Sequence, residues 1–179
     1  MTQTETIGAG IAGRYRDVLR DGHGDVVWDR GWRPNAIVGD CRRLLATFMR
    51  GNPGANGVLG LQVGAGLAAW DATAPPVPTA GQTALVDPNP FTVGPASLQI
   101  DFLAAGVPTA TPTNRIQIEA TLGPGVPPWP NGSHASADLR EFGLVGDLGG
   151  ATVLINYVTH PVIAKDPAST LSRTIWLQF

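Results

Sequence analysis

Proline and glycine punctuate this chain so often that only short regular segments fit between them. The sequence holds 23 glycines and 16 prolines in 179 residues, and they follow no fixed period. Collagen and regular solenoids are therefore excluded. Six of the prolines fall between residues 65 and 96. Because proline fixes φ and lacks a backbone donor, that stretch predicts a long loop and no central strand.

Between the loops, apolar and polar side chains alternate with the period of a β-strand. Two such segments surround Asp21–Gly24 and predict a hairpin over residues 14–30. A short apolar run bounded by glycines predicts a buried strand at residues 58–63. Further strands are predicted at residues 97–104, 114–122, 139–146, 151–158 and 170–179.

One segment has a helical period instead. Its apolar residues recur at three- and four-residue spacings and predict an amphipathic helix over about residues 36–50. Asn35 is a candidate cap, and Arg50 and Gly51 match the usual end signals. We therefore predict a mainly β fold: an antiparallel β-sandwich of about seven or eight strands, with one helix on a flank and long Pro/Gly-rich loops. It forms a single domain over residues 14–179, after a flexible or partner-docking arm at residues 1–13.

The charge content is low. Only 15% of the residues are charged and the formal net charge is -2, so much of the surface is neutral and suits a protein packed against neighbours. The alternative is a monomer whose loops are coated with Ser, Thr, Asn and Gly. Nucleic acid is not an expected partner, because Arg14, Arg16 and Arg20 are interleaved with Asp17 and Asp21.

The cellular setting is inferred from features that the sequence lacks. Cys41 is the only cysteine, which excludes an intrachain disulfide and favours synthesis in a reducing cytoplasm. The N-terminal segment has neither the basic start nor the apolar core of a signal peptide, and no apolar run is long enough to span a membrane. We expect no membrane partner.

Each candidate for chemistry has an ordinary explanation. Residues 8–13 spell the dinucleotide fingerprint GxGxxG, but neither a preceding strand nor a following helix is predicted there. Three scattered histidines, His23, His134 and His160, show no metal-ligand spacing. A triad of Ser133, His134 and Asp138, or a carboxylate pair of Asp101 and Glu119, would have to be assembled by folding. We predict no catalytic, metal or cofactor site and no enzymatic activity.

Tryptophan offers one alternative. The chain holds five tryptophans, and Trp129, set between prolines in a loop, is the best candidate for stacking on a sugar ring. Trp28 and Trp176 fall on predicted strands and are expected in the core or in an interface.

The C-terminal segment has a composite pattern: an E-x-G-L strand, a glycine turn, a second strand, a proline and a lysine, then a final strand. It resembles small structural proteins of bacteriophage tails and of contractile tail-like particles, of the baseplate or fibre-attachment type. The residues that carry the resemblance are Leu139–Leu144, Leu154–Asn156, His160–Pro161, Lys165 and Leu171–Ile175, with similar stretches at Gly39–Ala46 and Leu61–Gly66.

The resemblance implies a structural component of a phage virion or tail-like particle, made in the bacterial host cytoplasm, that assembles in many copies with itself and with other virion or tail proteins. Alternatives are a carbohydrate-binding β-sandwich with a glycan partner, a capsid decoration protein, and a small hydrolase. Interface residues are expected in the arm and loops, with polar residues that form ion pairs in the strand register or the subunit contact. The set is Ile7, Ile11, Trp70, Trp129, Arg140, Glu141, Lys165 and Arg173.

Overall fold

The computed structural model describes residues 10–179. Half of the chain is in strands, so the mainly β prediction is confirmed. The strands are β1 (Ala12–Arg20), β2 (Val26–Ile37), β3 (Ala55–Gly64), β4 (Phe91–Val93), β5 (Leu98–Ala104), β6 (Val107–Thr109), β7 (Arg115–Leu122), β8 (Asp138–Leu148), β9 (Ala151–Leu154), β10 (Asn156–Ala164) and β11 (Thr170–Gln178). The helices are α1 (Gly39–Met49), α2 (Trp70–Thr73) and a 3-10 turn, η1 (Pro95–Ser97).

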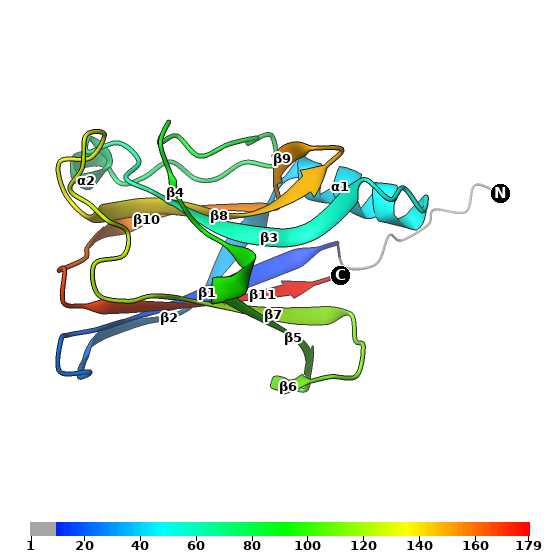
Figure 1. The fold of residues 1–179 in the computed structure, drawn as a ribbon, viewed down its shortest axis with the longest axis horizontal. Coiled ribbons are helices and arrows are strands. Elements are labelled where there is room, and N and C mark those ends of the chain that lie inside the picture. The colour runs from blue at the N-terminus through cyan, green and yellow to red at the C-terminus, as the bar shows by residue number, and fades with distance from the viewer. Residues whose placement is uncertain (1–9) are drawn as a thin grey trace.

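All strand pairs are antiparallel, and they form one continuous sheet in the order β4-β3-β8-β10-β2-β1-β11-β7-β5-β6, with β9 added beside β8. Figure 1 shows that this sheet folds over into two facing layers. The upper layer holds β3, β4, β8, β9 and β10, and the lower layer holds β1, β2, β5, β6, β7 and β11. β2 joins the layers, because its last residues, Ala36 and Ile37, pair with Tyr157 and Asn156 of β10.

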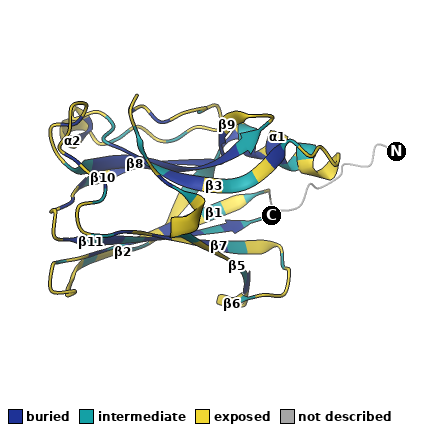
Figure 2. Cartoon of the chain, viewed as in Figure 1, coloured by how far each residue is buried: buried dark blue, intermediate teal, exposed yellow. Residues whose placement is uncertain are grey.

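The main core lies between the layers, and the period of two places residues there. In β11, Leu171, Arg173, Ile175 and Leu177 are buried, while the residues between them are only half-buried. Figure 2 shows buried residues (dark blue) along the strands of both layers. The alternation in the sequence therefore positions the inward side chains, including one arginine.

Helix α1 packs against β3, β8 and β9 of the upper layer, as predicted for a helix on a sheet flank. It begins at Gly39, later than predicted, because Ala36 and Ile37 still belong to β2. Asn35 is consequently not its cap; Val38 precedes the helix and makes no side-chain capping bond. The end was predicted to within one residue: the helix ends at Met49, Arg50 is the C-cap residue, and Gly51 follows with a φ of 76°.

The strand count was wrong, because residues 10–179 contain eleven strands and seven or eight were predicted. β4 and β6 have three residues each, too short for an alternation to be seen, and β6 contains Pro108. The segment predicted as one strand at residues 151–158 is divided at Ile155 into β9 and β10. Both pieces pair with β8, with a register change between them.

The long loop at residues 65–90 covers the outer face of the upper layer (Figure 1). As a result β8 is buried on both faces from Leu139 to Gly146. A second, smaller apolar cluster lies under this cover and consists of Val38, Leu85, Val145, Leu154 and Tyr157.

Candidate functional site

The first polar cluster joins the covering loop to β8. The carboxylate of Glu141, fully buried, accepts hydrogen bonds from the backbone N–H groups of Val86 (3.0 Å) and Asp87 (2.6 Å) and from the Tyr157 hydroxyl (2.5 Å). Burial and this hydrogen bond raise the pKa of Tyr157. Because every contact of the carboxylate lies within the chain, Glu141 holds the loop in place.

His134 belongs to the same cluster. Its Nε2 lies 2.8 Å from the Asp87 carboxylate, its Nδ1 lies 3.2 Å from Asn131, and its ring stacks on Trp129 with centroids 3.7 Å apart. The Ser133 N–H donates to Asn131, and Asp138 accepts from Ser136. The structure therefore does not assemble the triad of Ser133, His134 and Asp138, and Trp129 is buried instead of being exposed to a sugar.

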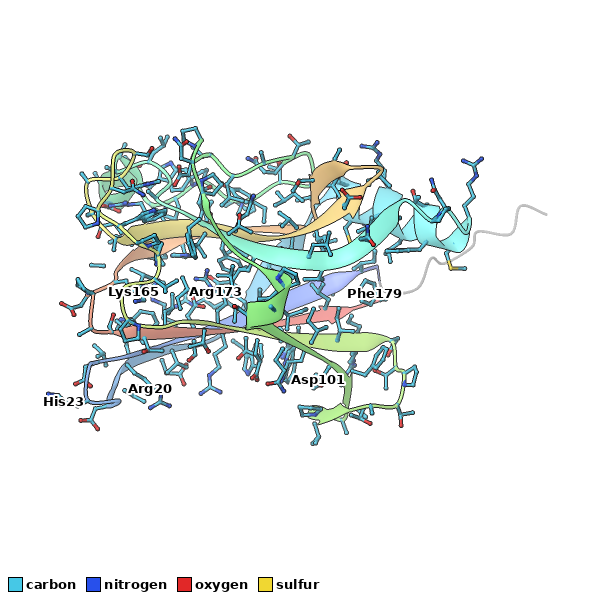
Figure 3. All side chains as sticks on the ribbon, viewed as in Figure 1. Arg20, His23, Asp101, Lys165, Arg173 and Phe179 are labelled. Atoms are coloured by element: carbon cyan, nitrogen blue, oxygen red, sulfur yellow. The ribbon has the colours of Figure 1, made fainter. Side chains whose placement is uncertain are left out.

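The second polar cluster lies between the layers. Arg173, with no exposed surface, donates to both carboxylate oxygens of Asp17 at 2.7 Å, stands 3.6 Å over the Phe142 ring and has His160 Nε2 at 3.3 Å. Figure 3 shows Arg173 and Lys165 between the layers. Burial would raise the pKa of Asp17, but the charge and hydrogen bonds of Arg173 outweigh burial and lower it.

His160 is held neutral in this cluster. Burial, reinforced by the nearby charge of Arg173, lowers its pKa to about 3. Its Nδ1 lies 2.9 Å from the Pro161 carbonyl oxygen, so that nitrogen carries the proton and Nε2 accepts from Arg173. The cluster is an ion pair capped by a neutral imidazole, enclosed by the core.

Arg140 and Lys165 also bind their own chain. Arg140 donates to the Asp71 carboxylate at 2.8 and 2.6 Å and to the Ala65 carbonyl oxygen at 3.1 Å, which fastens the start of the covering loop. Lys165 donates to the carbonyl oxygens of Gly123 (2.8 Å) and Ser169 (2.7 Å), and burial lowers its pKa.

The predicted interface residues were expected at the surface, but most of them are buried. Trp70, Trp129, Arg140, Glu141, Lys165 and Arg173 are all buried inside their own chain. Ile11 is half-buried just before β1, and Ile7 lies outside the described residues. Sequence reasoning treated the four charged residues as surface groups, although Arg173 shares its alternation phase with Leu171 and Ile175.

The remaining candidates do not converge either. Residues 12 and 13 of the GxGxxG stretch begin β1, an antiparallel strand, so the helix that a dinucleotide site needs does not follow them. Cys41 is buried in α1, where burial raises its pKa. Within residues 10–179, no group of three histidine, cysteine or acidic side chains is placed to hold a metal ion. No helix in that range is long and apolar enough to cross a membrane.

The outer face of the lower layer holds a polar cluster that includes both members of the candidate carboxylate pair. Asp101 and Glu119 lie there, each hydrogen-bonded to a glutamine: Gln99 at 2.9 Å for Asp101 and Gln117 at 2.9 Å for Glu119. They stand on neighbouring strands but not opposite each other, since Asp101 pairs with Gln117. This arrangement gives no sign of a paired acid and base.

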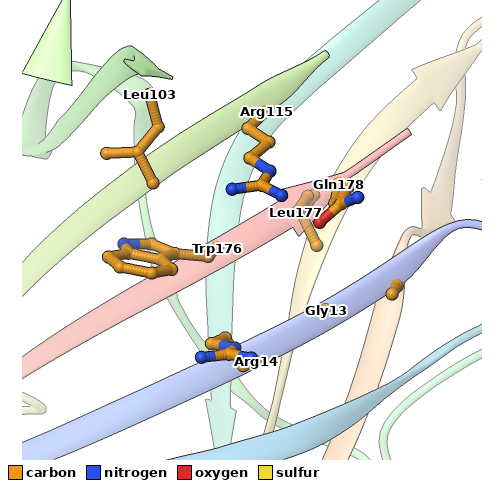
Figure 4. Close-up of a pocket in the computed structure, with 8 residues that line it drawn as sticks. Gly13, Arg14, Leu103, Arg115, Trp176, Leu177 and Gln178 are labelled. Atoms are coloured by element: carbon orange, nitrogen blue, oxygen red, sulfur yellow. The ribbon is translucent and has the colours of Figure 1, made fainter. Parts of the chain in front are cut away.

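A pocket of about 200 Å³ opens beside them (Figure 4). Its side chains include Trp176 of β11, Arg14 of β1, Arg115 of β7, Leu103 of β5 and Gln178. Trp176 donates from Nε1 to Gln117 at 2.7 Å and has Trp32 beside it, with ring centroids 4.2 Å apart. Comparison with known protein families, with curated proteins and with solved structures finds no match to this chain.

The same face corrects one statement about charge. Arg14, Arg16 and Arg20 are interleaved with acids in the sequence, but alternation sends all three to the outer face of β1 and Asp17 to the core. Arg16 is neutralised by a salt bridge with Asp29, and Arg20 donates to the Gly24 carbonyl oxygen. A signal for this cluster was present, because Arg14 and Arg16 share one phase of the alternation.

Proposed function

We propose that this protein is a structural component of a phage virion or tail-like particle, in a tail, baseplate or fibre-attachment position, and acts by multi-copy protein–protein assembly. The observation that carries the proposal is the covering loop at residues 65–90: an ordered, almost uncharged surface over the upper layer. Capsid decoration is the alternative within the same class, because it would use the same surface.

The loop is ordered by its own buried contacts. Asp71 binds Arg140, Asp87 binds His134, and the backbone after Leu85 binds Glu141. Near its middle, the Thr159 hydroxyl donates to the Pro76 carbonyl oxygen at 2.6 Å. A segment that is already restricted in this way loses little conformational entropy when a partner binds.

The loop also presents apolar side chains without free charge. Asp71 and Asp87 are its only charged residues: Asp71 forms a salt bridge with Arg140, and Asp87 is buried and hydrogen-bonded to His134. Val77 is 86% exposed and Leu67 51% exposed. Depletion of charge around exposed apolar side chains is the composition of an interface core. A second copy of this chain, or a neighbouring particle protein, is the partner that such a surface fits.

The test compares two equal charge insertions on opposite layers. Val77→Asp places a carboxylate in the covering loop, and Val107→Asp, at a residue 64% exposed in β6, is the matched control. We expect the wild-type protein to form rings or larger particles in electron microscopy and light scattering at high concentration. Val77→Asp should shift it toward the monomer, because docking would bury an unpaired charge, whereas Val107→Asp should assemble normally.

Two results would overturn the proposal. A wild-type protein that stays strictly monomeric at high concentration, alone and with lysate of its host, has no multi-copy role. Equal assembly of Val77→Asp and wild type would show that the covering loop is not the contact surface. Circular dichroism of both variants separates loss of assembly from loss of folding.

A further inference from the structure

The pocket on the outer face of the lower layer joins an aromatic ring to two cations. Trp176 lies between Arg14 and Arg115, and the Arg14 guanidinium carbon is 5.9 Å from the centroid of the indole (Figure 4). This surface is separate from the covering loop on the upper layer, so a ligand bound here would add a second activity to the proposed assembly function.

The two guanidinium groups are available to a ligand. Within residues 10–179, neither Arg14 nor Arg115 forms a salt bridge, whereas Arg16, Arg140 and Arg173 each have a carboxylate partner. Both side chains are exposed and come from strands on either side of β11. A planar guanidinium binds a carboxylate through two parallel hydrogen bonds, which is its strongest mode of anion recognition.

The indole is held in one orientation. The hydrogen bond to Gln117 fixes its N–H, and contact with Trp32 fixes one side of the ring. Trp32 is itself 37% exposed, and its ring is tilted by 42° against that of Trp176. A ring set in place before binding loses little freedom when a flat ligand stacks on it.

Acceptor groups complete the surface. Glu119 and Gln117 pair with Thr174 and Trp176 in the ladder between β7 and β11, and paired residues point to the same face of a sheet. Asp101 of β5 pairs with Gln117 and joins them. The Gln117 oxygen already accepts from the Trp176 N–H. The carboxylates of Glu119 and Asp101 have further acceptor positions for hydroxyl groups. The phosphodiester backbone of DNA offers them no donor, so the chemistry favours a hydroxylated ring over a nucleic acid strand.

We propose that this pocket binds an acidic saccharide. A uronic-acid-type ring stacks its C–H face on Trp176, Arg14 and Arg115 hold its carboxylate, and the carboxylates of Glu119 and Asp101 accept from its hydroxyl groups. The pocket volume of about 200 Å³ accommodates one sugar ring and leaves the chain ends free on the open face.

Isothermal titration of the full chain with trigalacturonic acid tests the proposal, with neutral maltotriose and a short oligothymidylate as the other probes. We expect trigalacturonic acid to bind more tightly than either. Removing both cations in Arg14→Gln/Arg115→Gln should weaken its binding by about tenfold or more, because the bidentate contacts are lost. Arg20→Gln is the control: it removes one positive charge from the same face of β1, about 20 Å along the strand from Arg14.

Each contrary outcome overturns the proposal. If maltotriose binds as tightly as trigalacturonic acid, the carboxylate is not recognised. If Arg20→Gln weakens the binding of trigalacturonic acid as much as the double variant does, the ligand is attracted by net charge alone. Tighter binding of oligothymidylate would assign the surface to single-stranded nucleic acid. No heat with trigalacturonic acid at millimolar concentration, from protein with wild-type circular dichroism, would exclude the class. None of these outcomes bears on the assembly test, which uses the opposite layer.

Discussion

The two faces of the β1–β11 pair carry the same kinds of side chain in opposite surroundings. On the inner face, Asp17 and Arg173 lie opposite each other in the ladder and share a bidentate salt bridge without solvent. On the outer face, Arg14 lies opposite Trp176, with its guanidinium carbon 5.9 Å from the centroid of the indole. Arg173 uses its hydrogen-bonding groups inside the core, where it binds Asp17 and lies over Phe142 of the upper layer. Arg14 forms no salt bridge within residues 10–179, so its hydrogen-bonding groups are available to a ligand.

This difference teaches that alternation, and not residue type, decides what a charged side chain does in this fold. Arg16 and Asp17 are neighbours on β1, yet breaking the buried Asp17–Arg173 pair should be strongly destabilising, whereas removing the exposed Arg16 should hardly matter. Three substitutions measure this contrast, from the largest expected effect to the smallest.

Arg173→Met should have the largest effect. It leaves the Asp17 carboxylate buried without a partner, and breaking a buried pair in this way typically costs about 3–5 kcal/mol of unfolding free energy. Urea denaturation measures the loss. The double variant Asp17→Leu/Arg173→Met should recover most of it, because both charges are then gone. A single substitution that costs no more than the double one would contradict the role given to the pair.

His160 should give a smaller effect that depends on pH. The unfolded chain protonates this imidazole below its ordinary pKa of 6.5, but the folded chain does not until about pH 3. Protons therefore favour unfolding between these values, and stability falls as the pH is lowered from 6.5. One such group contributes about 1.4 kcal/mol per pH unit once the unfolded form is protonated.

The measurement compares unfolding free energies of wild type and His160→Gln from about pH 6.5 to 4.5, above the window in which Asp17 and other carboxylates titrate. The variant should be less stable throughout but should show a shallower pH dependence. Parallel curves for the two proteins would mean that His160 titrates equally in the folded and unfolded chains, and that its enclosure between the layers has no electrostatic consequence.

Arg16→Gln should have the smallest effect. Its salt bridge with Asp29 is on the outer face, where solvent screens both charges. Hydrogen bonds with Arg16 and Gly31 lower the pKa of Asp29 to about 2, but at an exposed site this contact adds little to the free energy of unfolding. We expect a urea midpoint indistinguishable from wild type. A midpoint shift approaching that of Arg173→Met would erase the contrast between the faces.

Much of the fold could be predicted from the sequence, because the spacing of apolar residues and the positions of proline and glycine are local signals. The hairpin around Asp21–Gly24, the end of α1 at Gly51 and the strands at residues 98–104, 115–122 and 170–178 all follow from neighbouring residues. β4 and β6 could not be found, since three residues carry no period. The division of the chain at Ile155 depends on β2 arriving beside β10, which is a tertiary event.

The site could be predicted only where alternation was followed strictly. That rule places Arg173 with Leu171 and Ile175 in the core, and it places Arg14 and Arg16 together on the outer face. The sequence analysis instead expected Arg173 in an interface, and it expected the acids between the arginines of β1 to prevent a basic cluster. The burial of Trp129 against His134 had no local signal, because the two residues meet in a loop closed by Asp87 from a distant segment. Loop side chains of this kind are set by tertiary contacts.

The register of β1 against β11 also has a mechanical consequence. Ala12 lies opposite Gln178, so the chain enters β1 and leaves β11 at the same corner of the molecule (Figure 1). A pulling force applied between these two points would peel the strands apart one pair at a time instead of shearing the whole ladder at once. The separation of the strands would reach the Asp17–Arg173 salt bridge about halfway along the ladder. Breaking this buried pair would expose the core to solvent, so we expect the largest resistance to the force at that point.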